Sequence, residues 1–282
     1  MTPQIESLRA NSDLRREIAN VPYYRESHYS SLDPAGTLDY FHRRFVRHIR
    51  IGNMSADTTI ADIGCGFGWL SMAIAAFTPA RVIAVEMDRK RLDAAAAIAA
   101  LLGLNDRIIW REGSVVKIPL ADREADVTFC VEVLEHIQRD ARAFAELERV
   151  TGKYLVITTP NAAFPIIMHD TCLPLSHWLP MPARNLYATI CGRRETQFGN
   201  RFWAPWDIPR YLPNFKRVSH FLHFNSVDDY FDLYPYYLPY GRGSWRSAPS
   251  RKLRLYYNLA GSFGGVSQYF LQSLAGTFER RA

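Results

Sequence analysis

The sequence lacks the features that mark secreted, membrane-spanning or disulfide-stabilised proteins. It has 4 cysteines, at positions 65, 130, 172 and 191, and no two of them form a CxxC pair. Such spacing is typical of free thiols in a reducing compartment. The first residues, MTPQIESLRANSDLRRE, contain no apolar signal segment, and the longest apolar run, 94–102, is too short to cross a bilayer. These absences predict a soluble cytoplasmic protein.

Charge and aromatic residues are distributed unevenly along the chain. Residues 183–282 carry 14 Lys plus Arg against 6 Asp plus Glu, a net charge of +8, whereas the other residues carry 20 against 22. The same C-terminal stretch holds 22 of the 37 aromatic residues. It can be a solvated basic surface over an aromatic core, or a face that meets an anionic lipid head group, phosphorylated carrier or nucleic acid.

Short apolar runs alternate with amphipathic stretches between residues 58 and 160. The apolar runs predict strands at 58–63, 81–85, 107–110, 125–131 and 154–159. Helical spacing predicts helices at 38–51, 69–77, 88–102 and 135–150. This alternation indicates an α/β fold with a doubly wound, mostly parallel sheet, because parallel neighbours require right-handed crossovers.

The rest of the chain is less regular, and the composition divides it into four predicted segments. Residues 1–37 are expected to form a helical arm or lid, and 38–161 the α/β core. Residues 162–215, rich in proline and aromatics, are an irregular insertion after the fifth strand that caps the substrate. Residues 216–282 complete the sheet: 216–224 is predicted as a strand or loop, 226–233 as a short helix, and two more strands are expected within 235–278.

The stretch ADIGCGFGWL at 61–70 places three glycines, at 64, 66 and 68, directly after an apolar run. Glycine permits positive φ and lets backbone N–H groups approach a ligand without a Cβ in the way. We therefore expect a ligand at the carboxyl end of the first strand, beside the point where strand order reverses. The dinucleotide fingerprint is GxGxxG, and Trp69 stands here in place of its last glycine. The spacing favours a ligand with no phosphate on this loop.

Glu86 ends the second predicted strand, 22 residues after Gly64. A carboxylate at this position can accept hydrogen bonds from both hydroxyls of a ribose. The alternative is an acid favoured by the dipole of the following helix. Asp88 suits that second role better and is predicted as the helix cap.

These motifs together resemble the class I S-adenosylmethionine-dependent methyltransferases. DIGCGFG at 62–68 is similar to the glycine-rich loop of that family, and AVEMD at 84–88 to its second-strand acidic motif. The segment EGSVVKIPLADREADVTFCVEVLEHI at 112–137 resembles its third and fourth strands, and ITTPN at 157–161 the end of its fifth. The pattern is closest to small-molecule methyltransferases of the quinone-biosynthesis type. The resemblance implies a Rossmann-like fold with seven strands and S-adenosylmethionine as cofactor.

The resemblance also implies roles for residues of the glycine-rich loop. Gly64, Gly66 and Gly68, with Cys65 between them, pass under the methionine part of the cofactor. Asp62 orients this loop and the cofactor's amino group.

Residues after the second, third and fourth strands complete the cofactor site that the resemblance implies. Glu86 holds the ribose hydroxyls, and Met87 packs against the adenine face, which suits a polarizable thioether. Ser114 and Val115 stand where the family reads the adenine edge, with Ser114 in place of the usual carboxylate, so this hydrogen bond is weaker. Cys130 ends the fourth strand near the sulfonium.

Glu132, Glu135 and His136 follow the fourth strand. We predict His136 and Glu132 as catalytic residues, because a histidine has a pKa suited to removing a proton from an acceptor hydroxyl. The alternative is that Glu135 begins the next helix and His136 only caps or packs against it. His169 and His177 have no third ligand at metal spacing, so no metal is predicted.

The leading hypothesis is methyl transfer by in-line displacement to an oxygen, or next a nitrogen, of a small-molecule, glycan, carrier-linked or lipid-like acceptor. The alternatives are a nucleic-acid methyltransferase, for which no NPPY-type tetrapeptide is present, and a catalytically inactive cofactor-binding subunit. A nicotinamide-dependent oxidoreductase is disfavoured by the glycine spacing. Residues 183–282 are a predicted contact with an anionic surface, such as the inner face of a membrane.

Overall fold

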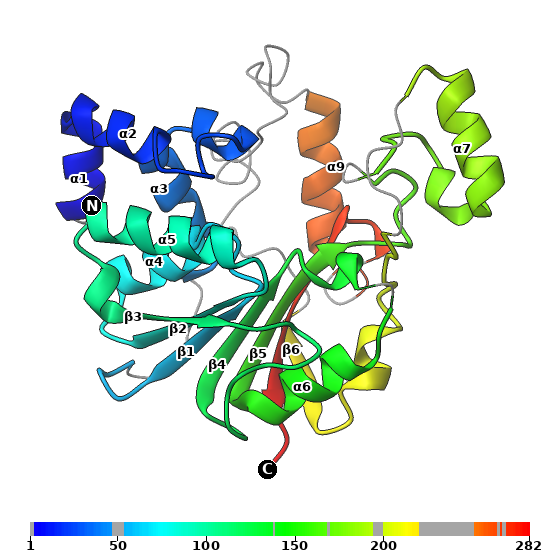
Figure 1. The fold of residues 1–282 in the computed structure, drawn as a ribbon. Helices are drawn as coiled ribbons and strands as arrows, with labels where there is room; N and C mark the ends of the chain where they lie inside the picture. The colour runs from blue at the N-terminus through cyan, green and yellow to red at the C-terminus, as the bar shows by residue number, and fades with distance from the viewer. Residues whose placement is uncertain are drawn as a thin grey trace.

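The computed structural model describes residues 3–46, 54–137, 139–167, 170–193, 200–219, 251–263, 266 and 269–282. A seven-stranded sheet runs through them in the order β3-β2-β1-β4-β5-β7-β6 (Figure 1). The strands are β1 (Thr59–Ile63), β2 (Arg81–Glu86), β3 (Ile108–Glu112), β4 (Ala125–Val131), β5 (Thr151–Pro160), β6 (Phe215–Ser219) and β7 (Ser273–Arg280). All neighbours up to β5 pair in parallel, and β7 runs antiparallel to both β5 and β6. The predicted α/β class with a mostly parallel, seven-stranded sheet is confirmed.

Helices cover both faces of the sheet. The helices α3 (Pro34–Arg44), α4 (Trp69–Phe77) and α5 (Arg89–Leu101) pack with one set of strand residues, including Ile60 and Val82. The helix α6 (Arg142–Val150) packs with the alternate set, including Ala61 and Ile83. Since neighbouring strand residues are buried on opposite faces, the central strands read as continuous apolar runs, which is why their positions were predictable.

Two of the predicted helices have different bounds in the structure. The helix expected at 38–51 begins at Pro34, because Asp33 caps it by accepting a 2.8 Å hydrogen bond from the Gly36 N–H; residues 47–53 lie outside the described ranges. The prediction of a helix at 135–150 is wrong for residues 135–141, since α6 begins at Arg142. A short 3₁₀ turn, η4 (Leu134–His136), comes first, and Arg139 then adopts φ +63° before α6 begins.

The end of the sheet also differs from expectation. β5 begins at Thr151, three residues before the predicted start. β6 occupies Phe215–Ser219, which agrees with the strand alternative predicted at 216–224, whereas the expectation of two strands within 235–278 does not account for it. β7 starts within that range and ends two residues beyond it. The helix expected at 226–233 lies outside the described residues.

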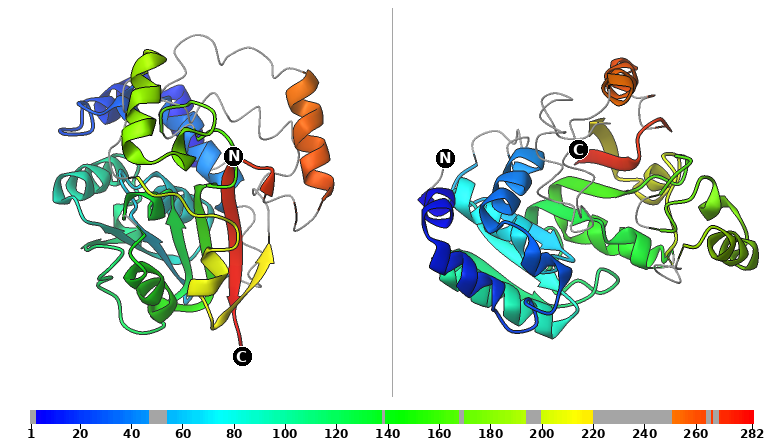
Figure 2. Two further views of the ribbon diagram at one scale, coloured as in Figure 1. Left: turned by 90° about the vertical axis from the view of Figure 1, so that its right-hand side faces the viewer. Right: turned by 90° about the horizontal axis from the view of Figure 1, so that it is seen from above.

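Four further helices gather at one end of the molecule, the end at which the parallel strands finish (Figures 1 and 2). They are α1 (Pro3–Ala10), α2 (Ser12–Ala19), α7 (Met181–Ile190) and α9 (Arg251–Ser262). The carboxyl end of β7 lies at the opposite end, near the C-terminus of the chain (Figure 1). Among the described helices, none has the length and apolar character needed to span a membrane. The predicted segment boundaries after residues 37, 161 and 215 stay predictions.

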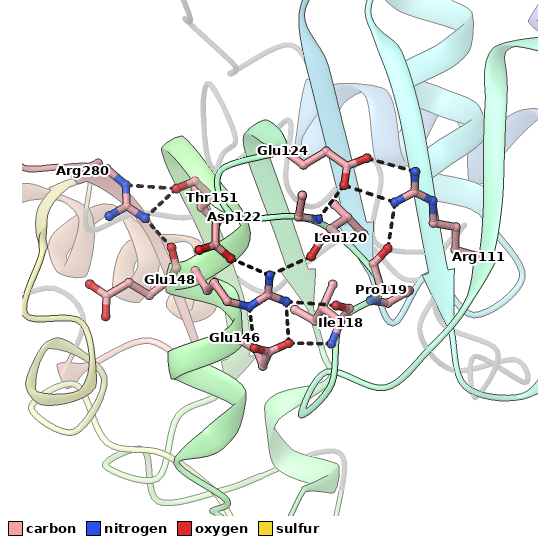
Figure 3. Close-up of polar contacts among 12 residues, drawn as sticks. Arg111, Ile118, Pro119, Leu120, Asp122, Glu124, Glu146, Glu148, Thr151 and Arg280 are labelled. Carbon is pink, nitrogen blue, oxygen red and sulfur yellow. Dashed lines mark hydrogen bonds and ion pairs between the residues drawn. The ribbon is translucent and has the colours of Figure 1, made fainter.

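A set of arginine–carboxylate pairs fastens the connection between β3 and β4 to α6 (Figure 3). We call these residues the Arg149 network; its members are Arg111, Asp122, Glu124, Glu146 and Arg149. Glu146 accepts hydrogen bonds from Arg149 Nε at 2.7 Å and Nη2 at 2.8 Å, and from the Ile118 N–H at 2.8 Å. The Arg149 guanidinium holds the pKa of Glu146 below its usual value, although partial burial opposes this. The network pairs each of its carboxylates with a guanidinium group.

Candidate cofactor and catalytic site

The glycine-rich loop leaves β1, turns over the end of β2 and enters α4. Gly64, Gly66 and Gly68 have φ values of +75°, +57° and +74°, so the predicted left-handed conformation is confirmed. The N–H groups of Gly64 and Cys65 both donate to the Val85 carbonyl, at 2.8 and 3.0 Å. This places the loop at the carboxyl ends of β1 and β2, directly beside β4, where the strand order reverses.

The three glycines differ in what surrounds them. A Cβ on Gly64 would lie 2.4 Å from Val133 Cγ2, and one on Gly68 would lie 2.9 Å from Trp110 Cη2. A Cβ on Gly66 would meet no heavy atom within 4 Å. Gly64 and Gly68 are therefore needed for packing, whereas Gly66 presents its backbone toward open space.

Glu86 is buried and joins the glycine-rich loop to β2. Its Oε2 accepts a hydrogen bond from the Gly66 N–H at 2.9 Å, and its Oε1 accepts from the N–H groups of Met87 at 2.9 Å and Asp88 at 3.0 Å. Each carboxylate oxygen has two lone-pair directions, so Oε1 is fully used and Oε2 keeps one direction for a ligand hydroxyl. Asp88 caps α5 through its Oδ1, which accepts from the Lys90 N–H at 2.9 Å, as predicted.

Asp62 lies under the loop and is only 2% exposed. Its Oδ2 accepts a 2.6 Å hydrogen bond from the Ser71 hydroxyl on α4. Burial raises the pKa of Asp62 to about 7, and the nearby Glu86 carboxylate adds to this, while the Ser71 hydrogen bond opposes it. No lysine or arginine of the described ranges forms an ion pair with Asp62, Glu86 or Glu135. The site thus holds buried carboxyls without the cations that the Arg149 network provides.

The residues predicted near adenine and the sulfonium lie in two different environments. The Met87 side chain is 71% exposed at the end of β2, and Ser114, half-buried, follows β3. Val115 is buried beneath them and Cys130 is fully buried in the core, where burial raises the pKa of its thiol well above the usual value. Met87 and Ser114 are therefore accessible to a ligand, whereas Val115 and the Cys130 side chain support the site from below.

Two glutamates lie close together after β4. Glu132 adopts φ +53°, an uncommon conformation for a non-glycine residue, and its N–H donates to the Thr158 carbonyl of β5 at 2.9 Å. Glu135 is fully buried, and its Oε2 accepts a 3.0 Å hydrogen bond from the Thr159 hydroxyl. Burial raises the pKa of Glu135 well above its usual value, and the carboxyl of Glu132, with which it shares a hydrogen bond, adds to this. Both causes disfavour the charged form of the Glu135 carboxyl.

His136 is exposed, and its Nδ1 lies 3.1 Å from the Asn200 side-chain oxygen. The prediction that Glu135 begins the next helix is wrong, since α6 starts at Arg142. Sequence reasoning missed the contribution of Asn200, which lies 64 positions from His136 in the chain, and did not select Glu135 as a site residue. The paired sequence Glu132–x–x–Glu135, ending a strand, was the available signal for the second glutamate.

The N-terminal arm packs against the glycine-rich loop. The Tyr23 hydroxyl donates to Asp88 Oδ2 at 2.7 Å. The ring of Tyr24 meets Phe67 edge-on with centroids 5.0 Å apart, and Tyr29 approaches the same ring at 5.7 Å. Aromatic residues of the arm thus form a wall beside the loop.

Comparisons with known proteins agree with this geometry. Residues 61–156 match the family model described as a methyltransferase domain. A sterol 24-C-methyltransferase of Gibberella zeae is 27% identical over 109 residues, which are 39% of this chain and 28% of that protein. A dimethylglycine N-methyltransferase of Parasynechococcus marenigrum is 27% identical over 106 residues, 37% of this chain and 38% of that protein.

The fold is shared with solved methyltransferases. The structure of geranyl diphosphate C-methyltransferase from Streptomyces coelicolor superimposes with a TM-score of 0.54 at 14% identity, covering 100% of this chain and 99% of that one. A probable S-adenosylmethionine-dependent methyltransferase of Mycolicibacterium smegmatis is 29% identical over 124 residues, 43% of this chain and 46% of that protein. Residues 61–156 are therefore similar to methyltransferase domains in both sequence and fold. The chain spans less than half the length of the curated relatives named above.

Proposed function

We propose that this protein transfers a methyl group from S-adenosylmethionine, which it binds on the glycine-rich loop and Glu86. The observation that carries the proposal is the open backbone at Gly66, whose N–H is fixed by the buried Glu86 carboxylate at the reversal point of the sheet. A glycine without a Cβ beside a carboxylate oxygen with an unused lone pair fits a ribose joined to an amino-acid chain.

The described residues fit the parts of this cofactor. Gly64, Gly66 and Asp62 would hold its methionine part, and Glu86 its ribose hydroxyls. The exposed Met87 side chain offers an apolar surface for adenine. Bound S-adenosylmethionine supplies an activated methyl group on its sulfonium.

Glu132 and His136 are the proposed groups that accept a proton from the methyl acceptor. Glu135, whose pKa is raised by burial, hydrogen-bonds to Glu132 and so holds that side chain in place. The Nδ1 contact with Asn200 fixes the ring of His136, so the proton would be taken at Nε2. The rest of the site positions the acceptor and excludes water.

We propose an oxygen, and next a nitrogen, of a small-molecule, glycan or lipid-like compound as the acceptor. The named relatives methylate carbon or nitrogen of small molecules, which supports the small-molecule class. The insertion after β5 presents Trp178, Trp206 and Tyr211 with 55%, 49% and 41% of their surface exposed. Aromatic side chains of this kind suit an apolar or ring-bearing acceptor.

The cofactor is tested by calorimetric titration with S-adenosylmethionine, S-adenosylhomocysteine and NADH. We expect binding of the first two and no response to NADH. Glu86→Ala should weaken that binding about tenfold or more, because hydrogen bonds to a charged group contribute about 1.5–3 kcal/mol each. Glu112→Ala is the matched control, since Glu112 stands in register with Glu86 on the next strand but is exposed. Binding of NADH alone, or of none of the three, contradicts the proposal.

The proton acceptor is tested by His136→Gln, which keeps a side chain able to hydrogen-bond to Asn200 but cannot take the proton. Turnover with an identified oxygen acceptor should fall roughly 10²- to 10⁴-fold, with affinity for S-adenosylmethionine retained. Undiminished turnover would show that His136 is not the base. Cofactor binding without turnover on any acceptor, in the unaltered protein, would instead favour the inactive cofactor-binding subunit.

A further inference from the structure

The helix α9 exposes a row of large apolar side chains. Leu255 and Leu259 are 59% and 52% exposed, and Phe263, just after the helix, is 57% exposed. Residues four positions apart lie above one another on one face of a helix, so the three form a continuous line. We call this line the α9 row. Ala260, on another side of the helix, is buried.

The α9 row is accompanied by positive charge. Arg251, Lys252 and Arg254 occupy the first turn of α9, and this turn contains no acidic residue. Cations at the amino end of a helix are disfavoured by its dipole, so the helix gains nothing from them within its own structure. In the sequence no aspartate or glutamate occurs between Asp232 and Glu279. An external anion fits the charges of Arg251 and Lys252.

The location of α9 relates it to the candidate site. It stands at the same end of the molecule as the carboxyl ends of the parallel strands (Figures 1 and 2). It precedes β7, whose first residue, Ser273, pairs with Pro160 at the carboxyl end of β5. A surface bound to α9 would therefore lie at the end of the sheet that holds the glycine-rich loop.

We propose that α9 is an interfacial helix that docks this protein on an anionic lipid bilayer. Basic residues beside a row of leucine and phenylalanine are the features that bind a helix in the plane of such a surface. Two other occupants fit less well. A second copy would oppose two stretches that each carry a net charge of +8 in residues 183–282, and nucleic acid would leave the α9 row exposed. The docking does not depend on the proposed methyl transfer.

The experiment is co-sedimentation of the full chain with vesicles of phosphatidylcholine alone or with about 30% phosphatidylglycerol. We expect binding only to the anionic vesicles, and weaker binding as salt rises from about 0.05 to about 0.5 M. The triple variant Leu255→Ser, Leu259→Ser, Phe263→Ser should bind roughly 100-fold more weakly. Because these side chains are exposed, thermal unfolding should be nearly unchanged.

Two further variants test whether vesicle binding depends on the charges and the apolar side chains of α9 itself. Arg251→Gln with Lys252→Gln should weaken binding to anionic vesicles about 25-fold, roughly fivefold for each charge. Leu186→Ser with Ile190→Ser alters an exposed pair four residues apart on α7, 62% and 74% exposed, and should leave binding unchanged. An equal loss in the α7 variant would overturn the assignment to α9.

Other results would also overturn the proposal. One is equal binding to vesicles with and without anionic lipid, and another is full vesicle binding by the triple variant. A third is that duplex DNA displaces the protein from the vesicles and the triple variant still binds that DNA. Sedimentation showing a dimer that the triple variant loses would instead assign α9 to a second copy. Titration of each variant with S-adenosylmethionine separates the two proposals, since failure of cofactor binding with vesicle binding intact would affect only the proposed function.

Discussion

Glu146 and Asp62 belong to the same α/β core but lie in opposite electrostatic surroundings. Glu146 accepts two hydrogen bonds from the Arg149 guanidinium, and its pKa is lowered (Figure 3). Asp62 has a hydroxyl as its hydrogen-bond partner, and burial raises its pKa to about 7. Burial also raises the pKa of Glu135, which lies at the same site. Acidic side chains therefore serve two different purposes in this fold.

The surroundings of these carboxyl groups differ between the Arg149 network, which has a structural role, and the candidate site. In the Arg149 network, carboxylates paired with guanidinium groups hold a long connection to α6. At the site, buried carboxyls are kept without cations, which costs stability but leaves groups that can bind hydroxyls or a ligand's amino group. Perturbed carboxyls concentrated at the reversal point of the sheet are what a binding site requires.

The largest expected effect is on stability at Asp62. Folded Asp62 keeps its proton up to about pH 7, whereas the unfolded carboxyl loses it near about pH 4. The resulting contribution to stability is complete below about pH 4 and is lost as the pH rises toward 7. Asp62→Asn, which stays neutral, should therefore be more stable than the parent at pH 8, by up to about 4 kcal/mol.

Urea unfolding at several pH values measures this effect. The free energies of the two proteins should converge near about pH 4 and separate as the pH rises. A gain that is independent of pH would show that Asp62 does not titrate between the two states as described. The same variant should bind S-adenosylmethionine more weakly if Asp62 orients the loop and the amino group.

The next largest effect should have the opposite sign. Glu146→Gln removes the charge that Arg149 and the Ile118 N–H surround, so it should destabilise the protein by about 1.5–3 kcal/mol at pH 7. Since the folded pKa of Glu146 is lowered, its contribution is present above about pH 4.5 and is lost as the pH falls further. The same unfolding measurements apply. A loss that persists undiminished at about pH 3 would contradict the ion-pair explanation.

The features of the fold and of the site that depend on local sequence patterns were predictable from the sequence. β1, β2 and β4 agree with their predicted ranges within a residue at each end, because strands buried on both faces give uninterrupted apolar runs. The left-handed loop was predicted because only glycine adopts that conformation at little cost. The cap at Asp88 followed from its position before an amphipathic helix.

Features that depend on distant parts of the chain were missed. The bounds of β6 and β7 could be predicted only as the broad ranges 216–224 and 235–278, because these strands are defined by pairing with each other and with β5, as in Phe278 with Leu155. The break before α6 arises because the Arg139 guanidinium hydrogen-bonds to the Phe202 carbonyl and to Asp207. The contact between Asn200 and His136 is also long-range, because it joins the insertion after β5 to the residues that follow β4.

The smallest effect on stability is expected when either of two glycines is replaced by alanine, and the two variants should differ in cofactor binding alone. Gly66 and Gly103 have φ values of +57° and +67°, and an added Cβ would meet nothing within 4 Å at either position. Alanine should therefore destabilise both variants equally, by about 1 kcal/mol, through backbone strain alone. Gly66→Ala should in addition weaken binding of S-adenosylmethionine about tenfold or more, since its Cβ would occupy space that a bound ligand needs. Thermal unfolding and calorimetry on the pair measure both quantities. Equal cofactor affinity in the two variants would show that the open side of Gly66 faces solvent and that the cofactor lies elsewhere.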